Sequence, residues 1–213
     1  FNMKNYDEGL KYLILSSKQN NSDSQVKLGI IYYYGYGVVR DINKSIYYLQ
    51  LASDKNNPKA EYLLGVIYFK GEYVSRDIEK GLNYLTKSAD HKNSDALYYL
   101  GKIYLHCRLV KRDIKKSINY IKLASDLNNA QAHVFLGMLY RQGVYVPKNN
   151  KKSIYYLGLA ARENDSYAQT FLSEFYYDNN DANRINNIDQ VNNPINNENE
   201  NLNNNNNENN NDH

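Results

Sequence analysis

Residues 60–89 decide the fold and read AEYLLGVIYFKGEYVSRDIEKGLNYLTKSA. The first part of this stretch, up to Lys70, places apolar residues three and four positions apart, as a helix with one buried face does. Gly71 can take the left-handed conformation that ends a helix, and Asp77 is a good N-cap for the next one. The stretch therefore predicts two helices joined by a short loop.

The same pattern returns every 36 residues. Its columns contain Leu28, Leu64, Leu100 and Leu136, each followed by Gly; Tyr32, Tyr68, Tyr104 and Tyr140; Asp41, Asp77, Asp113 and Asn149; and Ala60, Ala96, Ala132 and Ala168. Neither helix of a unit can bury its apolar face alone, so successive units must stack. The sequence predicts an all-α fold, a right-handed α/α solenoid of 36-residue helix pairs.

The repeats also predict the domain boundaries. We expect a solenoid over residues 1–177, with four full units at 24–167 between half units at 1–23 and 168–177. Residues 178–213 contain seven acidic residues against Arg184, a net charge of −6, so the rest of this chain of net charge +3 carries +9. This Asn-rich acidic tail is expected to be disordered, with at most a frayed capping helix at 183–193 and disorder from 194 onward.

Two further expectations come from composition and from the ends. The high Asn content is also what an A+T-rich genome encodes, so codon usage is an alternative to any functional reading of the composition. An apolar half unit at the N-terminus, preceded by Phe1 rather than Met, indicates a fragment of a longer protein whose upstream sequence is missing.

No pattern of catalytic or metal-binding residues is found. A single cysteine, Cys107, excludes an internal disulfide, and His91, His106, His133 and His213 fall in unrelated columns. The adjacent His106 and Cys107 are interpreted as a drifted glycine column. The longest uncharged stretch, residues 28–39, is too short for the roughly 20 residues of a membrane span. We therefore expect no enzyme, no catalytic residues, no metal, no cofactor, no small-molecule ligand and no membrane span.

The run Ala60-x-x-x-Leu64-Gly65-x-x-Tyr68-x-x-Gly71, followed by Val74-x-x-Asp77-x-x-Lys80 and Tyr84-x-x-x-Ser88-Ala89, resembles the Sel-1-like repeat. The resemblance covers residues 1–177 and implies an α/α fold related to the tetratricopeptide repeat. The third unit has Cys107 in place of the first loop glycine, so its loop departs from the motif.

The resemblance also implies a function and a compartment. The best-known eukaryotic members are the adaptor subunits of a membrane ubiquitin ligase in endoplasmic-reticulum-associated degradation, where they receive misfolded substrates. That implies the ligase and its substrates as partners, and the endoplasmic reticulum as location. Other members are cytosolic regulators, such as activators of cell-wall synthases, which implies the cytoplasm instead.

Two surfaces are candidates for binding. The first follows the first helices beside their packed face, where a protein or peptide could bind in a groove, although the same positions could be interior packing. It consists of Val26, Ile30, Tyr33, Tyr62, Val66, Phe69, Tyr98, Lys102, Leu105, Val134, Met138 and Arg141.

The second surface, the basic ladder, could bind an acidic peptide or a phosphate backbone, or could be a solvated surface. It consists of Arg40, Lys44, Arg76, Lys80, Arg112, Lys116, Lys148 and Lys152. The tyrosine columns 32/68/104/140 and 48/84/120/156 are expected in the core, with no stacking aromatics beside the ladder. The predicted function is a non-catalytic protein-protein interaction scaffold or adaptor. A cytosolic regulatory protein and a nucleic-acid-binding helical-repeat protein are the alternatives, nucleic acid being the less expected partner.

Overall fold

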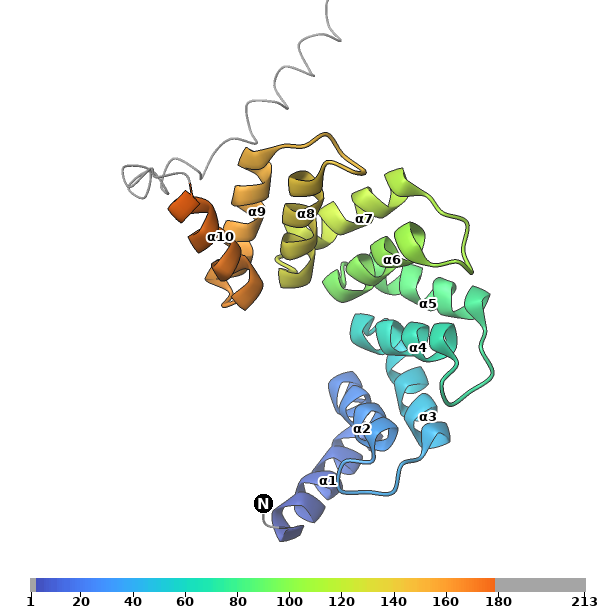
Figure 1. The fold of residues 1–213 in the computed structure, drawn as a ribbon. Helices are drawn as coiled ribbons and strands as arrows, with labels where there is room; N and C mark the ends of the chain where they lie inside the picture. The colour runs from blue at the N-terminus through green and yellow to red at the C-terminus, as the bar shows by residue number, and fades with distance from the viewer. Residues whose placement is uncertain (1–2, 179–213) are drawn as a thin grey trace, which may run out of the picture. The chain divides into compact units, whose positions relative to one another are not determined.

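The computed structural model describes residues 3–178 (Figure 1). In this range ten α-helices follow one another without a strand, which confirms the predicted all-α solenoid of helix pairs. They are α1 (Met3–Lys18), α2 (Ser22–Tyr34), α3 (Ile42–Ser53), α4 (Pro58–Lys70), α5 (Ile78–Asp90), α6 (Ser94–His106), α7 (Ile114–Asp126), α8 (Ala130–Gln142), α9 (Asn150–Arg162) and α10 (Ser166–Asp178). Of the tail expected to be disordered, Asp178 is the last residue of α10, and the rest, including the expected helix at 183–193, lies outside the described residues.

The chain divides into two compact units, residues 1–136 and 137–213. In the first unit each helix packs on its neighbours in sequence: α2 on α3, α4 on α5 and α6 on α7 form the pairs, and α1–α2, α3–α4 and α5–α6 link them. In the second unit α9 packs on α10. Leu28, Leu64 and Leu100 are completely buried in the first unit. The leucine column is therefore the core, as the repeat predicts.

The second helices of the four full repeats, α3, α5, α7 and α9, begin with the same pair of hydrogen bonds. In the second repeat the Asp77 carboxylate accepts from the backbone N–H of Lys80 at 2.9 Å, and the Asp77 N–H donates to the Tyr68 carbonyl at 2.9 Å. The residues Asp41, Asp113 and Asn149 make the equivalent bonds. These bonds satisfy backbone donors at the helix start and tie it back to the preceding helix.

The loops between paired helices begin in two ways. Gly71 ends α4 with a φ of 65°, a left-handed conformation that glycine adopts without cost. Cys107 instead ends α6 in an extended conformation, with φ −75° and ψ 127°. The Asp113 N–H still donates to the Tyr104 carbonyl at 3.0 Å. The departure that the sequence predicts for the third unit is therefore confined to the beginning of its loop.

The ends of the second helices give asparagine a structural role. Just past each end a non-glycine residue has φ between 56° and 67°; these residues are Asn20, Asn56, Lys92, Asn128 and Asn164. Asparagine tolerates this left-handed conformation better than most residues. The next position caps the following first helix, as Asn57 does by accepting from the N–H of Ala60 at 3.2 Å. In the repeats asparagine is thus selected by position, which codon usage alone does not explain.

The mid-helix glycines bring paired helices close together. A Cβ added to Gly65 would lie 2.7 Å from Leu85 Cγ and 3.0 Å from the Leu85 backbone nitrogen. Gly101 has the same relation to Ile121, with an added Cβ 2.4 Å from Cγ1. Both distances are shorter than van der Waals contact, so this column must remain glycine for the helices to pack as they do.

Candidate functional site

Each repeat stacks one tyrosine from each of its helices and covers the first with a lysine of the basic ladder. In the second repeat the Tyr68 and Tyr84 rings are 6.0 Å apart and nearly parallel, and Lys80 Nζ lies 3.9 Å from the Tyr68 ring centre. A hydrogen bond to the Tyr68 hydroxyl raises the pKa of Lys80. The other repeats form the same trio from Tyr32, Tyr48 and Lys44; Tyr104, Tyr120 and Lys116; and Tyr140, Tyr156 and Lys152.

These trios correct two expectations. Aromatic rings do accompany the ladder, because the spacing of twelve residues from Tyr68 to Lys80 folds back across the loop. The tyrosines are mostly half-buried rather than interior, and their hydroxyls find side chains as partners: Lys116 Nζ donates to Tyr104 Oη at 3.0 Å. Each tyrosine ring of a first helix is covered by a lysine of the ladder and by a tyrosine of the second helix. The lysines of the ladder therefore contribute to the packing of the two helices within a repeat.

The arginines of the basic ladder are placed differently. Arg40 lies with its guanidinium 4.9 Å from the ring centre of Tyr73, a residue of the loop in the next repeat. Arg76 Nε donates to the Lys70 carbonyl at 3.0 Å. Arg112 and Lys148 are exposed. Seven of the eight ladder residues are therefore exposed and Lys152 is half-buried, and several of them also make contacts within the chain.

The twelve groove residues divide by burial. Val26, Phe69 and Leu105 are buried and contribute to packing. Lys102 and Arg141 are exposed, and the half-buried members are Ile30, Tyr33, Tyr62, Val66, Tyr98, Val134 and Met138. Met138 and Arg141 belong to the second unit and the other ten residues to the first. The accessible part of the predicted groove on α2, α4 and α6 thus combines Tyr33, Tyr62 and Tyr98 with aliphatic side chains and Lys102.

Tyrosines on α4 and α6 pack edge to face. The Tyr62 and Tyr99 rings are 6.2 Å apart at 83°, and Tyr99 stands in the same relation to Phe69. Burial, with smaller contributions from Asp95 and neighbouring tyrosines, raises the pKa of Tyr62 to about 12. Burial also raises the pKa of Tyr98 and Tyr99. These phenols are neutral at ordinary pH, so the tyrosines make this part of the surface amphipathic, and Lys102 Nζ, 5.5 Å from the Tyr98 ring centre, adds a positive charge at its edge.

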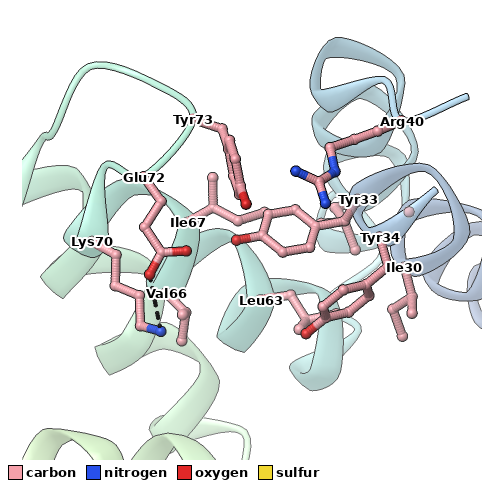
Figure 2. Close-up of a pocket in the computed structure, with 12 residues that line it drawn as sticks. Ile30, Tyr33, Tyr34, Arg40, Leu63, Val66, Ile67, Lys70, Glu72 and Tyr73 are labelled. Atoms are coloured by element: carbon pink, nitrogen blue, oxygen red, sulfur yellow. Dashed lines mark ion pairs between the residues drawn. The ribbon is translucent and has the colours of Figure 1, made fainter.

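A cavity of about 180 Å³ lies where the first repeat meets the second, and we call it the junction cavity (Figure 2). It is lined by Gly29, Ile30, Tyr33, Tyr34, Arg40, Leu49, Leu63, Val66, Ile67, Lys70, Glu72 and Tyr73. Aliphatic side chains of α2, α3 and α4 therefore line it together with three tyrosines. Figure 2 shows Tyr33 and Tyr34 reaching in from α2, opposite Tyr73 of the 71–77 loop.

The polar groups of the junction cavity interact around these rings. The Tyr33 ring meets Tyr73 edge to face at 5.7 Å, and Lys70 Nζ pairs with the Glu72 carboxylate at 3.4 Å. Burial, then the negative charge of Glu72, raises the pKa of Tyr33, while Arg40 opposes the shift. The cavity is thus a partly apolar opening with neutral phenols and charges of both signs.

Only part of this cavity is predicted from the sequence. Ile30, Tyr33 and Val66 belong to the predicted groove and Arg40 to the predicted ladder, which were treated as separate surfaces. Tyr34, which is 53% exposed, and Tyr73, which is 49% exposed, were missed. The repeat pattern does indicate that Leu63 is unusual, because Tyr99, Phe135 and Phe171 occupy its column in the later repeats.

The second unit contains a cavity of about 190 Å³ of a different kind. It is lined by Arg141, Lys148, Asn150, Ser153, Ile154, Phe171, Glu174 and Phe175. The Arg141 guanidinium lies 4.3 Å from the centre of the Phe171 ring. One residue of the predicted groove and one of the predicted ladder, Arg141 and Lys148, therefore line a common cavity here as well.

The most deeply buried acid is not a site for chemistry. Glu61 in α4 is 0% exposed, and its carboxylate lies between Lys87 of α5 and His91, the residue that caps the end of α5: Lys87 Nζ is 3.0 Å from Oε1 and His91 Nδ1 is 2.8 Å from Oε2. Glu61 Oε1 accepts no hydrogen bond within the described part of the chain, so the Lys87 interaction is an ion pair. Residues 3–178 contain no group of three His, Cys, Asp or Glu side chains able to hold a metal ion.

Capped helix pairs that follow one another along the chain, with half-buried aromatic side chains on their accessible face, define a helical-repeat protein. The Sel1 repeat matches residues 3–21, 22–57, 58–93, 94–129 and 130–165. The chain therefore belongs to the Sel1 repeat family.

Solved structures agree with this assignment. A Sel1 repeat protein from Oxalobacter formigenes is 29% identical with a TM-score of 0.73, over 79% of this chain and 69% of that one. The protective antigen c5321 of uropathogenic Escherichia coli, which displays the SLR fold, is 23% identical with a TM-score of 0.70, over 78% of this chain. The match spans only 36% of c5321. The immunity protein PA5088 from Pseudomonas aeruginosa shares the fold at 22% identity, with a TM-score of 0.58, over 79% of this chain and 61% of its own.

No curated protein matches the chain in sequence. Among the described helices, none combines the length and the apolar character that crossing a membrane requires.

Proposed function

We propose that this chain is a non-catalytic scaffold that binds a segment of a partner protein on the accessible face of α2, α4 and α6. The observation that carries the proposal is the junction cavity, where half-buried and exposed tyrosines surround an opening lined by aliphatic side chains. Tyrosine suits protein recognition because it supplies a large contact area with few rotatable bonds. Helical repeats suit it because they hold such residues on rigid elements.

A catalytic role has little support in the chain. The buried Glu61 carboxylate is held by Lys87 and His91 rather than facing a cavity that could admit substrate. His106 packs its ring on Phe135 at 6.2 Å, and the neighbouring Cys107 is half-buried. The candidate nucleophile pair is therefore better explained by packing.

The finer assignment, to the ubiquitin-ligase adaptor of the endoplasmic reticulum, rests on family resemblance. The activator of a cytosolic enzyme is the alternative on the same ground. The solved relatives described above come from bacteria, where the first role has no counterpart. Sequencing the full-length transcript separates the two, because an adaptor facing the lumen requires a signal peptide ahead of Phe1.

Nucleic-acid binding through the basic ladder is the competing function. It is weakened by the trios, in which the ladder's lysines sit on tyrosine rings that a base would need for stacking. A salt titration distinguishes the two functions. Binding to a phosphate backbone weakens steeply with ionic strength, whereas binding to a largely neutral tyrosine surface changes little.

Selection from a random peptide library tests the scaffold. The bait is the full chain, and selected peptides are measured on the double variant Tyr33→Ser/Val66→Ser and on Tyr47→Ser. Tyr47 is the matched control because it is 59% exposed on α3. We expect the selected peptides to lose binding to the double variant and to keep it with Tyr47→Ser. Peptides that bind both variants as tightly as the unmodified chain would rule out this face as the interaction surface.

A further inference from the structure

The junction cavity exists where the repeat departs from its own pattern. The column that contains Leu63 is aromatic in the three later repeats, as Tyr99, Phe135 and Phe171. Leu63 is only half-buried, and it packs against the core formed by Leu49, Leu64 and Ile67. A leucine side chain ends where a phenyl ring would continue, so space remains beside it.

The later aromatics show what this space accommodates. Tyr99 meets Phe69, which occupies the column of Tyr33. Phe135 meets His106, which occupies the column of Tyr34. Phe171 lies under Arg141, again in the column of Tyr33. In each later repeat, a ring from the Leu63 column therefore contacts the residue that corresponds to a wall of the junction cavity.

The size and lining of the cavity agree with a ring as its occupant. Its 180 Å³ exceeds the roughly 150 Å³ of an apolar cavity that holds benzene. Tyr33 already meets both Tyr34 and Tyr73 edge to face, and the three rings would offer edges and faces to a further ring. An aliphatic side chain would fill the volume less completely and would gain no ring–ring contact.

The charges at the cavity indicate which chemical group of the partner lies next to its aromatic ring. Lys70 is paired with Glu72. Within residues 3–178 no carboxylate forms an ion pair with Arg40, whose guanidinium lies over Tyr73. Arg40, Lys70 and Glu72 together carry a net charge of +1. A carboxylate beside the incoming ring would complement this charge, and Arg40 is exposed and able to reach it.

We infer that the junction cavity binds the C-terminal residue of a partner protein, an aromatic residue whose ring and terminal carboxylate lie next to each other. The inference rests on the proposed scaffold function and names the occupant of its accessible face. The partner's ring takes the place that Tyr99, Phe135 and Phe171 fill from within the chain, and its carboxylate pairs with Arg40.

The test uses N-acetyl-phenylalanine, which carries both the ring and the carboxylate, with N-acetyl-phenylalanine amide and N-acetyl-leucine as comparisons. Binding to the full chain is followed by the nuclear magnetic resonance signals of Tyr33 and Ile67. We expect saturable shifts with a dissociation constant of about 1 mM, the range of a ligand of this size. We expect binding about 2- to 5-fold weaker for the amide, as for loss of one exposed ion pair, and weaker still for the leucine derivative.

Two variants complete the test. Leu63→Tyr copies the later repeats, so it should abolish probe binding with a melting temperature equal to or above that of the unmodified chain; Leu123→Tyr, on the exposed side of α7, is its control. Arg40→Gln, at an exposed position that leaves folding intact, should remove the advantage of the acid over the amide.

The outcomes separate the two proposals. The inference is overturned if the probe gives no saturable shift, if Leu63→Tyr binds it as well as the unmodified chain does, or if N-acetyl-leucine binds as tightly. Selected peptides that still bind through Tyr33 and Val66 would then leave the scaffold standing. If the probe binds in the cavity but the library gives no peptide that depends on Tyr33 and Val66, the proposed function is overturned instead.

Discussion

Glu61 is a buried acidic residue in the second repeat, and the third repeat has apolar residues at the corresponding positions. The positions of Glu61, Lys87 and His91 are taken there by Leu97, Leu123 and Leu127. The triple variant Glu61→Leu/Lys87→Leu/His91→Leu therefore copies a solution that the chain already uses. The double variant Lys87→Leu/His91→Leu keeps the carboxylate and removes both of its partners.

The expected magnitudes follow from the burial of each group. Glu61 is 0% exposed, while the side chains of Lys87 and His91 are 42% and 36% exposed. Stranding the buried carboxylate in the double variant should cost about 3–5 kcal/mol of unfolding free energy. Replacing the whole cluster with apolar side chains should be neutral or stabilising, by up to about 4 kcal/mol.

Urea unfolding followed by circular dichroism measures both variants against the unmodified chain. A double variant as stable as the triple one would refute the reasoning, since it would mean that Glu61 reaches water or finds another partner.

Three further predictions concern single residues. Leu64→Ala should lower the unfolding free energy by about 2–5 kcal/mol, because Leu64 is completely buried. Lys80→Ala should lower it by no more than about 1 kcal/mol, which is what the contact of Lys80 with a tyrosine ring contributes. Equal losses of stability in thermal melts of the two variants would contradict the column assignment. Lys92→Asn should stabilise the chain by up to about 1 kcal/mol, because residue 92 has φ 59°; an unchanged urea midpoint would show that the left-handed residue carries no strain. Burial raises the pKa of Tyr62 from its ordinary 10.0 to about 12, so its neutral phenol contributes fully below pH 10 and loses that contribution as the pH rises towards 12. Tyr62→Phe should therefore move alkaline unfolding to higher pH, and an unmoved midpoint would count against burial of this phenol.

The helices and their order could be predicted because the signals for them are local. Gly71 and Asp77 mark the end of one helix and the start of the next within seven positions, and the 36-residue period repeats these signals along the chain. The leucine column could be assigned to the core because apolar spacing identifies the buried face of a helix.

The accessible surface could be predicted less well, because burial depends on the neighbouring repeat. Tyr33 and Phe69 occupy the same column, yet Tyr33 is half-buried beside the small Leu63 while Phe69 is buried beside the larger Tyr99. The spacing within one helix contains no information about that difference. It becomes visible when the residues of a facing column are compared by size.

The contact between Lys80 and Tyr68 illustrates another limit. The sequence predicts a solvent-exposed position for the lysine, from its charge, and a position in the core for the tyrosine. Their contact arises because the Asp77 N–H donates to the Tyr68 carbonyl and so draws the start of α5 back over the end of α4. A tertiary closure of this kind brings together residues whose spacing belongs to neither helix.

The caps have a consequence for how such a chain can change in length. The bonds that close the second repeat, from Asp77 to Lys80 and from Asp77 to Tyr68, lie within that repeat, and Asn57 caps the helix that begins directly after it. Recombination between repeats at the gene level that removes or adds a multiple of 36 codons therefore breaks none of them. Repeat number can therefore change without loss of a helix cap, whereas the junction cavity is kept only where the two repeats that line it remain neighbours.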